Sequence, residues 1–260
     1  MTKIIYFSGT GNTLWSAKKI AAQIRDQCEL INAGVLADSV CGREGAGAVI
    51  EADVIILMFP AYAYGLPLVF SKILEKAELK SPYIAALVTF GTSPGGALAQ
   101  AGRILRRKKT VIAYNGRIPA VENYTAIFGP QKPETVEKRL AMQEQATDEA
   151  ARCINERRKN RVVAFRPFSV LVSMLFSIGI KVFYKWYRVN SSCDGCALCE
   201  KLCPVNAVIM KQGRPVFTKK CEHCQGCIHW CPKNAILFAR IKSGTKRYHH
   251  PAINIADMTR

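Results

Sequence analysis

Eight of the eleven cysteines lie between Cys193 and Cys231, and their spacing is duplicated. The segment that begins at Cys193 has the pattern C-x2-C-x2-C-x3-C-P, and the segment that begins at Cys221 repeats it in full. The asparagine and the alanine that follow each proline recur as well. Cysteine thiolates are ligands for zinc and for iron–sulfur clusters. The duplication therefore predicts a metal–thiolate domain with pseudo-two-fold symmetry.

The spacing distinguishes the two kinds of metal site. Three thiolates at steps of three residues can bind three corners of one four-iron cubane, whereas the fourth cysteine, followed by proline, completes the other site in two-cluster proteins. Structural zinc is the alternative, but zinc domains usually join two distant C-x2-C pairs and need neither a third cysteine nor a crossed one. The predicted ligand sets are Cys193, Cys196, Cys199 and Cys231 for one [4Fe–4S] cluster, and Cys221, Cys224, Cys227 and Cys203 for the other.

Residues 190–240 resemble the bacterial-type two-[4Fe–4S] ferredoxins, because both cysteine motifs match that family in full. Four cysteines per cluster leave His223 and His229 without a need to act as ligands. Clustered cysteines in an intracellular chain favour metal over disulfides. The scattered Cys28, Cys41 and Cys153 are expected to be ordinary thiols.

A second motif, Ser8-Gly9-Thr10-Gly11-Asn12-Thr13, follows the first expected strand and enters a helix. Glycines and hydroxyl residues at a helix N-terminus offer backbone and side-chain donors, and the positive end of the helix dipole, to a phosphate. The motif has neither the lysine of the P-loop in NTPases nor the G-x-G-x-x-G spacing of dinucleotide-binding folds. Taken alone, it could also be an ordinary strand–helix turn.

This segment resembles the phosphate loop of flavodoxins, (T/S)-x-T-G-x-T, and residues 1–160 share the flavodoxin layout. The resemblance implies flavin mononucleotide (FMN), held also by the loops Pro60–Gly65 and Thr89–Gly96, with Tyr62 or Tyr64 stacked on the ring. Phe90 stands where many flavodoxins have a tyrosine, and neither loop has a tryptophan or the usual acidic residues. The implied cofactor-binding residues are Ser8, Gly9, Thr10, Gly11, Asn12, Thr13, Pro60, Ala61, Tyr62, Ala63, Tyr64, Thr89, Phe90, Gly91, Gly95 and Gly96.

Alternating strand and helix signals must position these loops. Short apolar runs predict strands at 3–7, 29–32, 53–59, 83–90 and 110–114, and helical patterns cover 12–28, 67–77, 96–108 and 134–159. Strands that alternate with helices of this length predict an α/β fold with a doubly wound, five-stranded parallel sheet. A small α+β ferredoxin domain should follow it.

Four parts are expected along the chain: an FMN-binding domain at 1–160, an apolar connecting helix at 161–189, the cluster domain at 190–240 and a C-terminal tail at 241–260. The uncharged run from Phe168 to Ile180 is short for a bilayer span of about 20 residues. It is either a helix packed against both domains or, with Tyr184 and Trp186 at the interface, an in-plane membrane helix.

The net charge of +18 is unevenly distributed. Residues 1–160 hold 21 Lys and Arg against 15 Asp and Glu, and residues 161–260 hold 16 against 4. Such a surface suits an acidic protein partner or an anionic lipid surface. No nucleic-acid-binding motif is present. The amino terminus reads as a strand and lacks a signal-peptide pattern, so a cytoplasmic protein is expected, with peripheral membrane contact through 167–189 as an option.

Together the two halves resemble anaerobe-associated fusions of a flavodoxin-like domain with a ferredoxin. The resemblance implies an electron-transfer protein that relays electrons between FMN and two clusters and on to a redox partner protein. A flavin-dependent reductase of a small organic substrate is an alternative, although no acid–base constellation is evident beyond the nearby Tyr62, Tyr64 and Tyr114. A non-catalytic zinc scaffold is the third.

Overall fold

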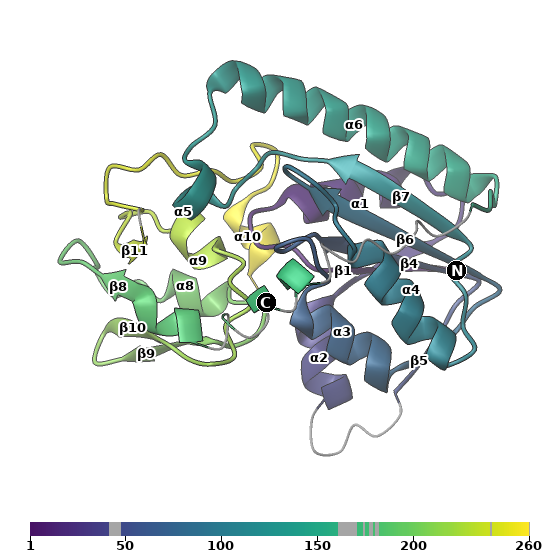
Figure 1. Ribbon diagram of the computed structural model, residues 1–260, viewed down its shortest axis with the longest axis horizontal. Coiled ribbons are helices and arrows are strands. Elements are labelled where there is room, and N and C mark those ends of the chain that lie inside the picture. The colour runs from purple at the N-terminus through teal and green to yellow at the C-terminus, as the bar shows by residue number, and fades with distance from the viewer. Residues whose placement is uncertain are drawn as a thin grey trace.

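The computed structural model describes residues 1–41, 48–160, 171–173, 175–176, 179, 182–239 and 241–259. Its largest sheet has five parallel strands in the order β2-β1-β4-β6-β7 (Figure 1). The strand bounds are β1 Thr2–Tyr6, β2 Cys28–Asn32, β4 Val54–Pro60, β6 Tyr83–Phe90 and β7 Tyr114–Pro119. Counted among these five, the order is 2-1-3-4-5, that of the flavodoxin-like doubly wound sheet. The predicted fold class is therefore confirmed.

Helices cover both faces of this sheet because successive residues of each buried strand point to opposite sides. Ile5 and Phe7 pack with the core under α2 (Ala33–Cys41), α3 (Leu68–Lys76) and α4 (Ala97–Arg107). Ile4 packs with the core under α1 (Asn12–Gln23) and α6 (Pro133–Asn155). The result is a three-layer unit, and α6 crosses the top of it in Figure 1.

Two expected elements have other bounds in the structure, and three observed elements were not expected. The last strand was placed at 110–114 but begins at Tyr114, because Asn115 and Gly116, which read as turn residues, pair with β6. The first helix ends at Gln23 rather than at residue 28, since Ile24 is extended and Cys28 already belongs to β2. The sequence reading also missed α2 and the short parallel pair β3 (Val49–Glu51) and β5 (Glu78–Lys80).

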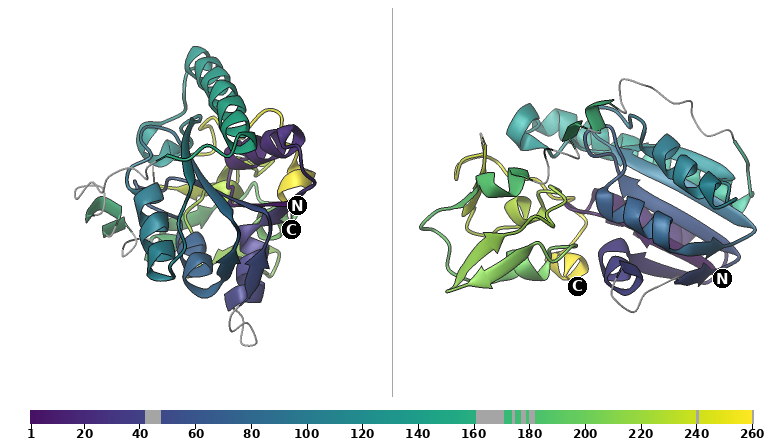
Figure 2. Two further views of the ribbon diagram at one scale, coloured as in Figure 1. Left: turned by 90° about the vertical axis from the view of Figure 1, so that its right-hand side faces the viewer. Right: turned by 60° about the horizontal axis from the view of Figure 1, so that its bottom comes forward.

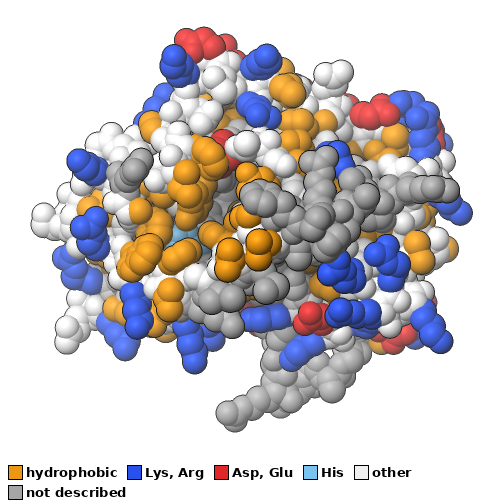
Figure 3. Space-filling view, viewed as in Figure 1, with side chains coloured by type: hydrophobic (Ala, Val, Ile, Leu, Met, Phe, Trp, Pro, Cys, Tyr) orange, Lys and Arg blue, Asp and Glu red, His pale blue; other side chains and the backbone are white. Residues whose placement is uncertain are grey.

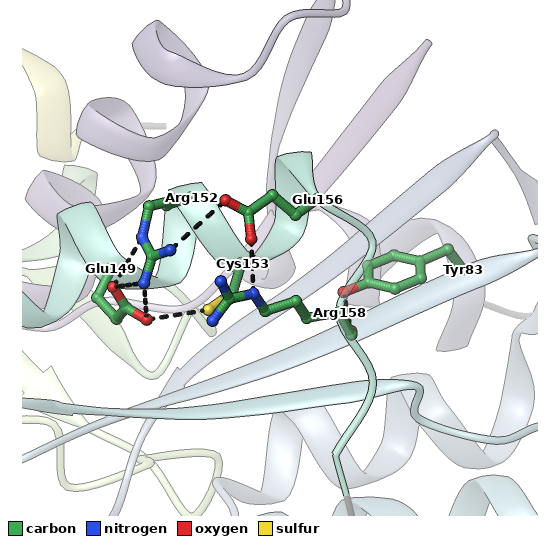
Figure 4. A network of polar contacts seen from close by, with 6 residues as sticks. All are labelled: Tyr83, Glu149, Arg152, Cys153, Glu156 and Arg158. Carbon is green, nitrogen blue, oxygen red and sulfur yellow. Dashed lines mark hydrogen bonds and ion pairs between the residues drawn. The ribbon is translucent and has the colours of Figure 1, made fainter.

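A network of polar contacts anchors the C-terminal end of α6 (Figure 4). The Arg152 guanidinium makes a two-point contact with the Glu149 carboxylate, with N–O distances of 2.7 and 3.0 Å. Glu156 accepts from Arg158 at 2.6 Å, and the Tyr83 hydroxyl donates to the Arg158 carbonyl at 2.7 Å. Exposed ion pairs of this kind each contribute little stability. Their effect here is to orient the chain that leaves α6 against β6.

The C-terminal unit, residues 187–239, is built from two copies of one motif. Its elements are β8 Tyr187–Val189, α8 Leu198–Lys201, β9 Val208–Lys211, β10 Arg214–Phe217, α9 Gly226–His229 and β11 Ile236–Phe238. β8 pairs with β11, and β9 with β10, both antiparallel. A shift of 28 residues along the sequence places α8 on α9, β8 on β10 and β9 on β11. The duplication predicted from the cysteine spacing is therefore present in the fold.

The connecting segment differs from the single helix expected over 161–189. Residues 161–170 lie outside the described residues. A 3₁₀ turn, η1 (Tyr184–Trp186), precedes β8. Residues 187–189 form a strand rather than the end of a helix because they pair with β11. The second unit thus begins three residues before the expected boundary at 190. Among the described residues, no helix is long and apolar enough to cross a membrane.

The tail crosses back to the N-terminal unit (Figure 2). Ile253 and Met258, the latter in α10 (Ile255–Met258), belong to the same apolar cluster as Leu14 of α1 and Trp230. The His250 ring stacks on Trp15 with centroids 4.8 Å apart. The tail is therefore part of the packed interface between the two units.

Candidate functional site

One cavity of about 500 Å³ opens at the carboxyl ends of the sheet strands. The loops after β1, β4 and β6 line it, as a ligand site at the switch point of an open sheet requires. β1 and β4 are neighbours here although β2 and β3 separate them in the chain, so the sheet reverses its winding between them. The three loops that the sequence analysis singled out thus meet at one place.

Most of the predicted cofactor-binding residues line this cavity, and three do not. Those at the cavity are Ser8, Gly9, Thr10, Asn12, Thr13, Pro60, Ala61, Tyr62, Ala63, Tyr64, Thr89, Phe90 and Gly91. Gly11 instead packs against His250 and Ile253 of the tail. Gly95 and Gly96 pack behind Tyr64, whose carbonyl accepts from the Gly96 N–H at 2.8 Å. These three glycines shape the loops rather than line the cavity.

The predicted phosphate loop is held by side chains of other loops. α1 begins at Asn12 after Gly11, whose φ of 93° places it in the left-handed region. The Thr13 and Thr89 hydroxyls are 2.7 Å apart, and Asn123 donates to the Thr10 hydroxyl. Because the helix N-terminus and these hydroxyls face one end of the cavity, that end suits an anionic phosphate.

A fourth loop, residues 120–128, also lines the cavity, and the sequence reading missed it. It contributes Glu122, Asn123 and Tyr124, followed by Ile127 and Phe128 of the short helix α5 (Thr125–Phe128). The Asn12 amide donates to the Val121 carbonyl at 3.1 Å. The loop follows the carboxyl end of β7, which would have pointed to it. The strand expected at 110–114 ends too early to do so.

Apolar side chains surround the mouth of the cavity. Val172, Leu175, Phe176 and Phe183 line it from the connecting segment. On this face hydrophobic side chains gather around a hollow (Figure 3). The largest exposed ones beside the cavity are Ile127, Phe128 and Leu175, which are 67%, 51% and 60% exposed. The end of the cavity opposite the phosphate loop is therefore open and apolar.

The first predicted ligand set, here called the outer cysteines, comprises Cys193, Cys196, Cys199 and Cys231. All four line one small cavity, although Cys231 lies in the second repeat. Burial raises the pKa of the Cys199 thiol to about 12, and Cys196, Cys231 and Cys193 add to the increase. The fold therefore brings three cysteines of the first repeat together with Cys231 of the second.

The second set, here called the inner cysteines, comprises Cys203, Cys221, Cys224 and Cys227. Burial raises the pKa of Cys221 to about 11, and Cys203 of the first repeat adds to it. Burial also raises the pKa of the Cys224 thiol, and the nearby Cys203 and Cys221 raise it further. Burial raises the pKa of the Cys227 thiol well above its usual value, and Cys221, Cys224, Cys203 and Cys199 add to the increase. The two sets therefore lie beside each other.

Backbone donors approach the sulfurs in both repeats. The N–H of Ala207 donates to Cys203 Sγ at 3.1 Å, and that of Ala235 donates to Cys231 Sγ at 3.3 Å. Left-handed residues occur at matching positions, for example Ala197 and Gln225. Thiolates that accept N–H bonds in a buried shell are suited to hold an anionic cluster.

The described residues hold no three His, Cys, Asp or Glu side chains grouped closely enough for a single metal ion. A cubane is a different case, because each of its four thiolates binds a different iron atom. Of the other cysteines, Cys28 donates to the Asp26 carbonyl and Cys153 to the Glu149 carboxylate, at 3.4 and 3.2 Å. The side chain of Cys41 lies outside the described residues.

The cavity at the predicted phosphate loop and the inner cysteines share a wall. His223 and Cys224 line the cavity. A Cβ added at Gly9 would lie 2.6 Å from the Cys224 carbonyl oxygen and 2.9 Å from the Cys224 Cβ. Burial raises the pKa of Tyr62 well above its usual value, and Cys224 adds to the effect. The loop that contains Gly9 is therefore packed directly against Cys224 of the inner set.

Further bonds fix this wall. Trp230 Nε1 donates to the Gly9 carbonyl at 3.2 Å. The Glu222 carboxylate accepts from the first N–H groups of α3, Leu68 and Val69, at 2.9 and 2.7 Å. Free N–H groups at a helix start are stabilised by such an acceptor. The second unit thus caps a helix of the first.

No protein-family model and no curated protein sequence matches the chain. Among solved structures, two-electron reduced Megasphaera elsdenii flavodoxin is 16% identical, with 57% of this chain and 99% of that chain covered and a TM-score of 0.30. The Trp repressor binding protein from Bacillus subtilis is 12% identical, with 58% and 96% covered and a TM-score of 0.35. A flavone reductase is 14% identical, with 62% and 66% covered and a TM-score of 0.35. The assignment of the fold therefore rests on strand order.

Proposed function

We propose that this chain is an electron-transfer protein, in which residues 1–160 bind FMN and residues 190–240 bind two [4Fe–4S] clusters. The observation that carries the proposal is the shared wall, where Cys224 of the inner set lines the cavity of the phosphate loop. Edge-to-edge proximity of two redox sites is what a relay requires, and the protein supplies distance, insulation and potential. When bound, FMN exchanges one or two electrons and each cluster exchanges one.

The residues for FMN have separate roles. The N–H groups at the start of α1 and the hydroxyls of Ser8, Thr10 and Thr13 would hold the phosphate. The loops after β4 and β6, including Tyr62, Tyr64 and Phe90, would enclose the ring. Glycine at position 9 lets the phosphate loop contact the backbone of Cys224.

The cysteines would hold one cluster in each set. The N–H bonds from Ala207 and Ala235 to the sulfurs stabilise thiolate charge, as does the basic surface around this unit. Burial of the inner set excludes water from the path toward FMN. Each set would combine three cysteines of one repeat with one of the other, so the two clusters would also tie the repeats together.

Anaerobic purification and reconstitution test the proposal. We expect about eight iron and about eight acid-labile sulfide per chain, with about one FMN released on denaturation. Reduction should then bleach the visible cluster absorbance and give electron paramagnetic resonance signals of two reduced clusters. A colourless protein with stoichiometric zinc and no flavin would contradict it.

A flavin-dependent reductase is the second candidate, and the open apolar mouth of the cavity favours it. Ile127, Phe128 and Leu175 leave an apolar opening beyond the phosphate loop that an aromatic substrate could enter. Turnover separates the two functions. A carrier exchanges electrons with artificial acceptors but converts no organic compound, whereas a reductase forms a reduced product under the same conditions.

A further inference from the structure

We propose that the outer cysteine set is the port through which this protein exchanges single electrons with an acidic carrier protein, and that the inner set lies between this port and the flavin cavity. The proposal rests on the proposed function. It adds an order of transfer, a docking surface and the charge of the partner.

The order follows from what each set touches. Cys224 of the inner set lines the flavin cavity, and no outer cysteine does. α8, which contains Cys199 of the outer set, packs against α9, which contains Cys227 of the inner set. Leu198 and Cys199 pack on the apolar cluster that contains Cys203 and Cys227. The inner set therefore has the cavity on one side and the outer set on the other.

Exposure follows the same order. In the outer set Cys196 is exposed and the other three cysteines are partly buried, whereas in the inner set Cys221 and Cys224 are partly buried and Cys203 and Cys227 are buried. An electron can leave for a second protein only where a redox centre comes near the surface. The outer set, which holds the exposed Cys196, is the more accessible of the two.

The surface around the outer set is basic. Lys233 lines its cavity, Lys211 follows the lining residue Met210, and Lys201 ends α8 two residues after Cys199. All three lysines are exposed. Lys201 and Lys211 have no ion-pair partner within the described ranges. Unpaired positive charge steers an oppositely charged protein to this surface and orients it.

The acidic residues of this face are already engaged. Asp194 pairs with Lys233 at 3.7 Å and accepts from the Cys196 N–H at 3.2 Å. The Glu200 carboxylate accepts from the Met210 N–H at 2.8 Å. These two carboxylates stand against Lys201, Lys211 and Lys233, so the face keeps a net positive charge that favours an acidic partner over a basic one.

Each encounter moves one electron. A reduced carrier would lose one electron to a cluster held by the outer cysteines, and the electron would pass through the inner set to the flavin. Two encounters deliver two electrons, and two protons from solvent complete reduction of the flavin. The reverse sequence oxidises the flavin and reduces two carriers.

The test uses the full-length protein loaded with iron, sulfide and FMN. The probe is an acidic plant-type [2Fe–2S] ferredoxin, whose spectrum differs from that of four-iron clusters, and basic cytochrome c is the opposite probe. The variant is Lys201→Glu/Lys211→Glu/Lys233→Glu. The matched control, Lys76→Glu/Arg106→Glu/Arg107→Glu, changes the same charge at the last turns of α3 and α4.

These control residues are exposed. α3 begins at its contact with Glu222 of the second unit and α4 begins behind Tyr64 of the cavity, so the last turns of both helices lie away from these contacts. Affinity for the ferredoxin is measured by calorimetry at low salt, and electron exchange by stopped-flow spectroscopy. The lysine variant should lose at least about tenfold in affinity and rate, and the control should lose less than about threefold. High salt should remove the difference between them.

Equal losses in both variants, or tighter binding of cytochrome c than of the ferredoxin, would overturn the proposal. So would ferredoxin binding that the lysine variant leaves intact while binding to anionic lipid vesicles is lost, because the surface would then be a membrane site. If the lysine variant loads less iron, Lys201→Gln/Lys211→Gln replaces it, with the same expected direction. Failure of the proposed function is a separate result, since it appears as missing iron or FMN in the unchanged protein.

Discussion

Gly9 lies where the phosphate loop meets the backbone of Cys224, and the space between them is too small for a methyl group. Gly9→Ala would place a Cβ 2.6 Å from the Cys224 carbonyl oxygen. Both loops are fixed by other bonds, so one of them must move. We expect the variant to lose about 1–3 kcal/mol of stability and to bind FMN at least about tenfold more weakly. Fluorescence titration of the apoprotein with FMN measures the loss.

The control for this prediction is Gly244→Ala. A Cβ at Gly244 would have no heavy atom within 4 Å, and the backbone there needs no left-handed conformation. Its FMN affinity and midpoint of thermal unfolding should match those of the unchanged protein. If Gly9→Ala also behaves like the unchanged protein, the phosphate loop is not packed against Cys224 in solution.

His250 is buried against Trp15, and burial lowers the pKa of its ring to about 4, with His249 adding to the effect. The ring is therefore neutral when folded, while the unfolded chain binds a proton below about pH 6.5. Stability contributed by this difference is intact above pH 6.5 and is lost as pH falls toward 4. The loss amounts to as much as about 3 kcal/mol, at 1.36 kcal/mol per pKa unit.

The measurement compares thermal unfolding of the unchanged protein with that of His250→Gln between pH 4.5 and 7. Glutamine keeps a polar side chain and does not titrate there. The unchanged protein should lose more stability on acidification than the variant, because other histidines contribute equally to both. Parallel curves would show that His250 is exposed in solution.

At the scale of elements, the C-terminal tail supports the phosphate loop. The Tyr248 hydroxyl donates to Asn12 Oδ1 at 2.7 Å, and the His250 N–H donates to the Thr10 carbonyl at 2.9 Å. Asn12 in turn reaches the Val121 carbonyl of the fourth loop. Tail, phosphate loop and fourth loop therefore form one hydrogen-bonded layer.

Tyr248→Phe removes one bond of this layer and keeps the ring. We expect a loss of roughly 0.5–1.5 kcal/mol, seen as FMN affinity lowered by about two- to tenfold with unchanged iron content. Tyr184→Phe is the matched control, because no hydrogen bond of the Tyr184 hydroxyl is found within the described residues. Loss of iron in Tyr248→Phe would instead mean that the tail supports the cluster unit.

The elements that the sequence predicts best are those whose residues form a continuous apolar run because both faces are buried. β6 was predicted at its observed bounds, because its apolar run is buried on both sides. β7 was misplaced because Asn115 and Gly116 favour turns locally and are held in the strand by pairing with β6. Tertiary pairing of this kind leaves no local signal.

The residues of the candidate sites also fall into those that a local sequence motif predicts and those that only the fold brings together. The phosphate loop and both cysteine motifs are contiguous in sequence, so their residues could be named before the fold was known. The fourth loop and the apolar mouth come from segments without a motif: the sheet brings the first to the cavity, and Val172, Leu175, Phe176 and Phe183 form the second. Contact between Gly9 and Cys224 joins positions more than two hundred residues apart, which no single-sequence pattern records.

At the scale of the whole molecule, crossed grouping of the cysteines decides which site a given substitution reaches. Cys203 belongs to the first repeat in sequence but to the inner set in the fold, beside Cys224 and the flavin cavity. Cys231 belongs to the second repeat but lines the outer cavity. A substitution at either should therefore act on the site of the opposite repeat.

Cys203→Ala and Cys231→Ala form the matched pair for this prediction, since each removes the cysteine before a proline in its own repeat. Cys203→Ala should remove the inner cluster, and it should also stop cluster-dependent reduction of FMN, because the remaining outer cluster no longer has the inner site between itself and the cavity. Cys231→Ala should remove the outer cluster and leave exchange between FMN and the inner cluster intact. Iron content, electron paramagnetic resonance of the remaining cluster and anaerobic flavin reduction distinguish the two. If Cys203→Ala keeps fast exchange with FMN while Cys231→Ala loses it, each repeat ligates its own cluster and the crossed arrangement is wrong.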